Sequence, residues 1–162
     1  MTDTLYDSDP VRWSDEQAAA LRRLALSSAS NSVDWENVIE EVESVGRSQR
    51  QAVDSLLINA LTHLLKMAGD PDSLSVRAWS REVKAFLDQV RMRATGAIRA
   101  DLNLDALWRE AVLGAGMELR EYGRALPPAL PETCPFRLAD LLDPAKDART
   151  LSRQIVSDPD RP

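Results

Sequence analysis

Apolar side chains recur along this chain at steps of three and four residues, the spacing that places them on one face of an α-helix. No stretch alternates apolar and polar residues for long enough to predict a β-strand. The pattern therefore predicts an all-α fold, a single helical bundle of about five helices. The expected helices begin at Ser14, run from Trp35 to about Val45, from Ser48 to about Ala68, from Ser73 to Thr95, and from Leu104 to Tyr122.

The third of these helices carries the broadest apolar surface. Its apolar residues cover more than half of the helix circumference: Val53, Leu56, Leu57, Ala60, Leu61, Leu64, Leu65 and Met67. A helix that is apolar on so much of its surface is normally contacted by several neighbours. We therefore expect it to lie at the centre of the bundle.

Capping residues suggest where the helices begin and end. The run Ser14-Asp15-Glu16-Gln17 matches a capping box, which predicts the start of the first helix. Asp34 is expected to cap the second helix, and Gly46 is expected to end it as a left-handed C-cap. A kink at Gly46 inside one long helix is the alternative.

The C-terminal part of the chain differs in composition. Four prolines fall between Pro127 and Pro135, which forbids helix there and predicts an extended, proline-rich strap. A short helix is expected from Arg137 to Leu142, ended by Pro144. The polar tail that follows is expected to be either a loosely docked helix or frayed. We therefore predict one helical-bundle domain over residues 1–143 and a polar C-terminal tail over residues 144–162.

Composition narrows the function classes. The 162 residues include 26 acidic and 20 basic side chains, a net charge of −6, which disfavours nucleic acid as a partner. One cysteine, Cys134, excludes an internal disulfide and any CxxC site, and one histidine, His63, excludes sites that need two. No metal site and no cofactor is predicted.

The chain shows no signature of export or of membrane insertion. Its first residues carry three aspartates and no apolar core of the kind a signal peptide needs. Uninterrupted apolar stretches are a few residues long, which predicts no membrane span. We expect an acidic, intracellular, cytoplasmic protein in which Cys134 is a free thiol.

Several short motifs follow one another in a fixed order. They are Asp34-Trp35-Glu36-Asn37, Glu40-Glu41-Val42-Glu43, Gly46-x-Ser48, His63-Leu64-Leu65-Lys66, Trp79 early in the next helix, and Glu132-Thr133-Cys134-Pro135. In this combination the chain resembles the DUF29 family of uncharacterised, all-helical bacterial proteins, over about residues 5–143. Met67 follows the histidine motif where many relatives have an aromatic residue. The resemblance implies an all-helical fold and supplies no activity.

One candidate site is a polar cluster between the second and third helices. Its members are Glu40, Glu41, Arg50, Asp54 and His63. If these helices fold against each other at Gly46, Glu40 or Glu41 could reach Arg50, and His63 could join them. The cluster is interpreted first as a structural network that fixes helix register, because structural ion pairs mimic functional ones. A carboxylate–imidazole site for metal binding or acid/base chemistry is the alternative.

A second candidate is a basic face on the fourth helix, formed by Arg77, Arg81, Lys84 and Arg91 and interrupted by Asp88. From Ser73 to Arg99 there are six basic and two acidic residues, although the whole chain is acidic. This face is interpreted first as a solvated outer surface, and contact with an anion or a phosphate is the alternative.

Two functional hypotheses from different classes remain. The first is a non-catalytic helical interaction or adaptor module, with a protein partner or a second copy of the chain as its target. The second is a metal-dependent or acid/base enzyme that uses Glu40, Glu41 and His63. No complete catalytic motif is present in the sequence, which favours the first.

Overall fold

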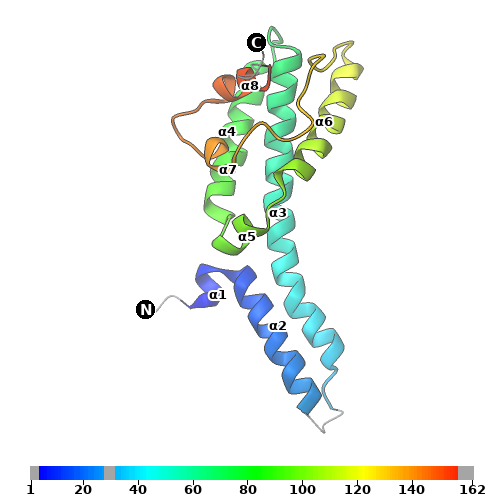
Figure 1. Cartoon of the computed structure of the whole chain (residues 1–162), viewed down its shortest axis with the longest axis vertical. Coiled ribbons are helices and arrows are strands. Elements are labelled where there is room, and N and C mark those ends of the chain that lie inside the picture. Colours follow the sequence, from blue (N-terminus) through cyan, green and yellow to red (C-terminus); the bar gives the residue numbers. More distant parts are fainter. Residues whose placement is uncertain (1–3, 28–31, 157–162) are drawn as a thin grey trace. The chain divides into compact units, whose positions relative to one another are not determined.

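The computed structural model describes residues 4–27 and 32–156, and these residues are helical or irregular, without strands. The all-α prediction is confirmed. The helices (Figure 1) are α1 (Leu5–Ser8), α2 (Pro10–Ser27), α3 (Trp35–Gly69), α4 (Val76–Arg93), α5 (Gly96–Asp101), α6 (Leu104–Glu121), α7 (Leu138–Leu141) and α8 (Ala148–Val156). The described residues thus form eight helices where about five were expected. No helix among them combines the length and the apolar run that a membrane span requires.

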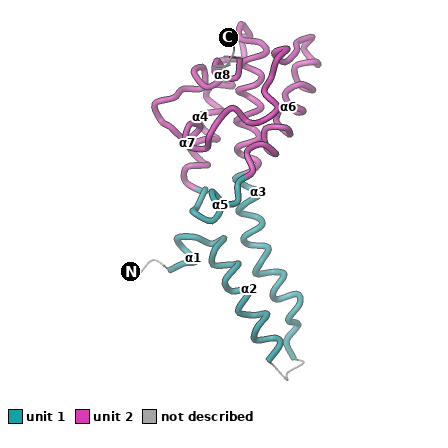
Figure 2. The backbone as a smooth tube through the Cα atoms, viewed as in Figure 1, with its two compact units in different colours: residues 1–53, 93–102 teal, residues 54–92, 103–162 magenta. Residues whose placement is uncertain are grey.

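The contacts of the chain group into two compact units (Figure 2). Unit 1 consists of residues 1–53 and 93–102, and unit 2 consists of residues 54–92 and 103–162. Helix α3 contributes its first half to unit 1 and its second half to unit 2. The division into a domain over residues 1–143 and a tail over residues 144–162 stays a prediction.

In unit 1 the helix expected from Ser14 begins earlier. Helix α2 starts at Pro10, and the side chain of Asp9 accepts a hydrogen bond from the backbone N–H of Arg12 at 3.1 Å. Proline suits this first helical position because its missing N–H has no partner there in any case. Ser14 is therefore not a cap. It is fully buried inside α2, and its hydroxyl donates to the carbonyl of Val11.

The predicted break at Gly46 is wrong, because α3 continues without interruption from Trp35 to Gly69. A Cβ atom at Gly46 would lie 2.4 Å from the hydroxyl oxygen of Ser14 on α2. Of the glycines described, Gly123 has a positive φ and Gly46 does not. Gly46 thus serves the close approach of α2 and α3, and its lack of a side chain matters more than its backbone freedom. The predicted cap at Asp34 is confirmed, since its carboxylate accepts from the backbone N–H of Asn37.

Unit 2 is built around the second half of α3, which α4 and α6 flank in Figure 1. The side chains of Leu57, Leu61, Leu64 and Leu65 are completely buried. This half of α3 touches α4 and α6 through side chains, and its Leu64 carbonyl accepts a hydrogen bond from Ser152 of α8 at 3.1 Å. The expectation that this helical segment has several neighbours is confirmed.

The segment between α6 and α7 contains no helix and connects back to α6 by two hydrogen bonds. The indole N–H of Trp108 donates to the carbonyl of Pro131 at 2.9 Å, and the backbone N–H of Cys134 donates to Asp105 at 2.9 Å.

For the residues after α7, the sequence analysis predicted either a loosely docked helix or a frayed tail. Residues 148–156 form α8, in which Leu151 and Ile155 are buried, while residues 157–162 lie outside the described residues.

Candidate functional site

The predicted polar cluster falls in two different units. Glu40, Glu41 and Arg50 belong to unit 1, whereas Asp54 and His63 belong to unit 2. The partner expected for Arg50 is wrong. Its guanidinium lies 2.8 Å from Asp15 of α2 and 3.4 Å from Asp101 of α5, because α3 does not fold back at Gly46.

The acidic members of the cluster make local contacts. Glu40 pairs with Arg47 two turns along the same helix, and both side chains are largely exposed. The hydroxyl of Ser44 donates to the backbone carbonyl of Glu41. Burial raises the pKa of the Asp54 carboxyl, and repulsion from Glu110 on α6 raises it further. These contacts hold single side chains in place and do not assemble an acid/base pair.

His63 lies against α4 in unit 2. Its Nε2 atom is 3.0 Å from a carboxylate oxygen of Glu82, and its ring stacks on Phe86 with the centroids 5.9 Å apart. Its Nδ1 atom is buried and has no hydrogen-bond partner among the described residues. Burial lowers the pKa of the imidazole and Lys66 lowers it further, against the opposing effects of Glu82 and Glu118. His63 is therefore held as a neutral ring packed between α3 and α4.

Lys66, which the sequence analysis did not select, is more deeply buried than His63. Its side chain is 9% exposed, its Nζ atom lies 2.5 Å from Glu118 of α6, and it sits 4.8 Å from the ring centroid of Trp79 on α4. A buried ammonium group needs such partners, because an unpaired buried charge is costly. His63 and Lys66, the first and last residues of the motif His63-Leu64-Leu65-Lys66, thus connect α3 with α4 and α6. We call the group formed by His63, Lys66, Trp79, Glu82 and Glu118 the HLLK cluster.

The described residues offer no ready metal centre. Within residues 4–27 and 32–156, no group of three or more His, Cys, Asp or Glu side chains is arranged to hold a metal ion. Cys134 is a free thiol, and burial raises its pKa, so that the thiol stays protonated near neutral pH. The described residues therefore provide no group that would activate this thiol as a nucleophile.

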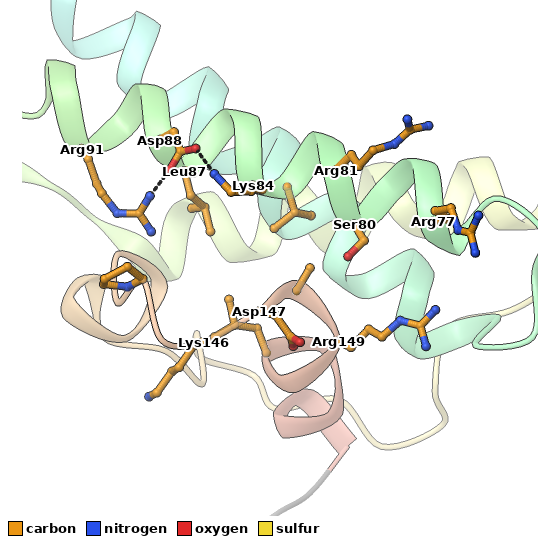
Figure 3. Close-up of a pocket in the computed structure, with 14 residues that line it drawn as sticks. Arg77, Ser80, Arg81, Lys84, Leu87, Asp88, Arg91, Lys146, Asp147 and Arg149 are labelled. Atoms are coloured by element: carbon orange, nitrogen blue, oxygen red, sulfur yellow. Dashed lines mark hydrogen bonds and ion pairs between the residues drawn. The ribbon is translucent and has the colours of Figure 1, made fainter.

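The four residues of the predicted basic face line one groove of about 370 Å³ in unit 2 (Figure 3). The groove lies between α4, which carries Arg77, Arg81, Lys84 and Arg91, and the segment that ends in α8. That segment supplies Lys146 and Arg149, which the sequence analysis missed because it assigned them to a polar tail. In all, six basic and two acidic side chains line the groove, and we call it the basic groove.

One end of the basic groove is already neutralised by ion pairs. Lys84 lies 2.6 Å from Asp88, Arg91 also contacts Asp88, and the Nε of Arg91 donates to the carbonyl of Leu142 at 2.8 Å. The hydrogen bond from Lys84, with further help from Arg91, lowers the pKa of Asp88. Lys146 lies 2.7 Å from Asp140. The cations at this end have partners within the protein.

The other end of the basic groove is different. Among the described residues, Arg77 and Arg81 form no ion pair, and the Ser80 hydroxyl forms no hydrogen bond. In Figure 3, Arg77 and Ser80 of α4 face the gap toward Arg149 of α8, while the guanidinium of Arg81 points away from α8. This open end is the strongest candidate for contact with a ligand.

Comparison with known proteins agrees with the fold and the motifs. The family model described as "Domain of unknown function DUF29" matches residues 5–145. None of the curated proteins matches the chain. An α-helical protein of unknown function from Rhodospirillum rubrum ATCC 11170 is similar in structure, with a TM-score of 0.84 and 24% sequence identity over 94% of this chain and 98% of that chain. At that identity the likeness shows the fold alone. The family match spans most of the sequence, and the chain therefore belongs to the DUF29 family.

Proposed function

We propose that this protein is a non-catalytic helical adaptor whose basic groove binds an acidic segment of a protein partner. The observation that carries the proposal is the local charge of the groove. Six basic side chains face two acidic ones there, in a chain whose net charge is −6. A concave surface lined by one sign of charge attracts and orients a partner of the opposite sign.

The groove also has an apolar floor. Val83 and Leu87 of α4 and Leu151 of α8 line it, and each is at least nine-tenths buried in the core of unit 2. Its volume of about 370 Å³ is at the small end of the range for ligand pockets, roughly 300–1,000 Å³. A peptide with alternating acidic and apolar side chains matches these walls and this floor. The proposal places the module in the cytoplasm, where Cys134 stays reduced.

The test is a titration of the full chain into a short fluorescein-labelled peptide in which glutamates alternate with leucines, followed by fluorescence anisotropy. We expect saturable binding that weakens as the ionic strength rises from about 0.05 to 0.5 M, because salt screens exposed charges. A peptide of the same length with lysines in place of the glutamates should not bind.

A pair of matched variants locates the binding. R77E/R149E reverses two cations of the basic groove, and R109E/R120E reverses two exposed cations of α6 outside it. Both variants change the net charge equally, so a difference between them reports on the groove and not on overall charge. We expect R77E/R149E to weaken binding about tenfold or more, and R109E/R120E to leave it nearly unchanged. Equal losses in both variants, or no binding by the unaltered chain, would contradict the proposal.

A further inference from the structure

The open end of the basic groove brings together donors from two helices. Arg77 comes from α4, Arg149 comes from α8, and the hydroxyl of Ser80 lies on the α4 side of the gap (Figure 3). Arg77 and Arg149 form no ion pair with any described residue. The hydrogen bonds of Thr150 lower the pKa of the Asp147 carboxyl most, and the charge of Arg149 lowers it further. Asp147 is itself engaged, since it accepts the backbone N–H of Thr150 at 2.7 Å.

Both arginines occupy helix positions that are unfavourable for a cation. Arg77 is the second residue of α4 and Arg149 is the second residue of α8. The N-terminal turn of a helix carries a partial positive charge, which favours anions and disfavours arginine. Neither α4 nor α8 has an acidic residue in its first turn. Two helix starts and two guanidinium groups thus meet one carboxylate, that of Asp147 at the start of α8, so positive charge predominates at this opening. A local rule broken in this way is expected where a ligand binds.

The donor set indicates which anion fits. A carboxylate has two oxygens and one negative charge, and the fork of one arginine satisfies it. A phosphate monoester has three terminal oxygens and a charge near −2 at neutral pH, which suits two forks and a hydroxyl. We propose that Arg77, Ser80 and Arg149 bind a phosphate monoester carried by the acidic segment that occupies the basic groove. This inference rests on the proposed adaptor function and adds the chemistry that the partner must present.

The remainder of the groove agrees with a phosphorylated peptide. The neutralised end, where Asp88 pairs with Lys84 and Arg91, offers little attraction for a second strong anion. The apolar floor formed by Val83, Leu87 and Leu151 lines the same groove and can receive a flanking apolar side chain. A phosphorylated residue next to an apolar one therefore matches the groove better than a uniformly acidic run.

The experiment compares three peptides that differ at one position, which carries serine, glutamate or phosphoserine beside a leucine. Fluorescence anisotropy with the full chain should show about tenfold tighter binding of the phosphoserine peptide than of the serine peptide, and a smaller gain for glutamate. Equal affinity for all three peptides would overturn the phosphate site but leave the adaptor proposal standing. Failure of every peptide to bind would contradict the adaptor proposal as well.

Two variants separate the phosphate site from general attraction. R77K/R149K keeps both charges but removes the planar forks, so it should reduce the preference for phosphoserine over glutamate while it retains binding of the glutamate peptide. S80A should reduce the same preference by a smaller factor, because one hydrogen bond to an ionised group is lost. R109K/R120K is the control on α6 and should behave as the unaltered chain. An unchanged preference in R77K/R149K would overturn the assignment of these arginines.

The source of the phosphate group is tested with small competitors. O-phosphoserine and inorganic phosphate should displace the phosphoserine peptide, but far more weakly than an unlabelled copy of that peptide, since they lack the contacts with the groove floor. If either displaces the peptide as effectively as the unlabelled copy does, the ligand is a small phosphate compound and the inference of a phosphorylated segment is wrong.

Discussion

The HLLK cluster and the basic groove both place charged side chains in unit 2, but they treat those charges in opposite ways. In the cluster, Lys66 is 9% exposed and its ammonium group is matched by Glu118 and Trp79. At the open end of the groove, Arg77 and Arg149 form no ion pair with a carboxylate among the described residues. An enclosed charge depends on its partners, because a buried charge without them is costly, whereas accessible charges without partners are available to a ligand.

The largest expected effect is that of removing the buried cation. Lys66→Ala should lower the free energy of unfolding by about 2 kcal/mol, because the variant loses the packed side-chain stem, the contact with Trp79 and the bond to Glu118. Chemical denaturation followed by circular dichroism measures this change. Lys84→Ala in the groove is the matched control, since that side chain is 78% exposed, and its midpoint should shift little. If the denaturation midpoints of Lys66→Ala and Lys84→Ala shifted by similar amounts, the charges of the HLLK cluster and of the basic groove would not differ in their contribution to stability.

His63 gives the cluster a dependence on pH. Burial and Lys66 hold the pKa of the folded imidazole below its usual range, despite the opposing effects of Glu82 and Glu118. The unfolded chain, with a pKa near 6.5, therefore binds the proton more readily, and stability falls as the pH drops below about 6.5. Above about pH 7 both states are neutral and the contribution is constant. Thermal melting from acidic to neutral pH should show this slope, and His63→Gln should flatten it.

Arg50 in unit 1 is intermediate in exposure between Lys66 of the HLLK cluster and Lys84 of the basic groove. The Arg50 side chain of α3 is 28% exposed, and it pairs with Asp15 and Asp101. Arg50→Ala should destabilise the protein by about 1 kcal/mol or less, because its two partners are more than half exposed and keep their contact with water. If denaturation experiments showed that Arg50→Ala lowers the free energy of unfolding as much as Lys66→Ala does, the exposure of a charged side chain would not determine how much it contributes to stability.

The helical periodicity predicted where the longer helical segments lie, because the apolar stripes depend on local spacing alone. It did not predict that the two segments on either side of Gly46 form the single helix α3. The bounds of α6 match the expected segment from Leu104 within one residue. Gly46 shows why boundaries are harder. A glycine that ends a helix and a glycine that allows a second helix to approach look the same in sequence, and the neighbour that decides between them, Ser14, is 32 residues earlier.

The basic groove could be predicted only in part for a related reason. Helical spacing places Arg77, Arg81 and Lys84 on one face, but it does not show what that face meets. The opposite wall comes from α8, whose buried positions Ala148, Leu151 and Ile155 have the three- and four-residue spacing of a docked helix. That spacing, in an otherwise polar segment, is the sequence signal that predicts α8 and the presence of Arg149 on a docked helix. The ion pair of Lys66 with Glu118 joins residues 52 positions apart, which a single sequence does not show.

Measuring both binding and stability in one variant, R77Q/R149Q, tests most directly whether the basic groove is a ligand site. We predict that binding of the phosphoserine peptide falls about tenfold or more. The free energy of unfolding should stay within about 0.5 kcal/mol of the unaltered chain or rise, because two cations leave unfavourable helix starts. If R77Q/R149Q instead unfolds at a markedly lower denaturant concentration, or still binds the peptide with full affinity, the basic groove is not a ligand site.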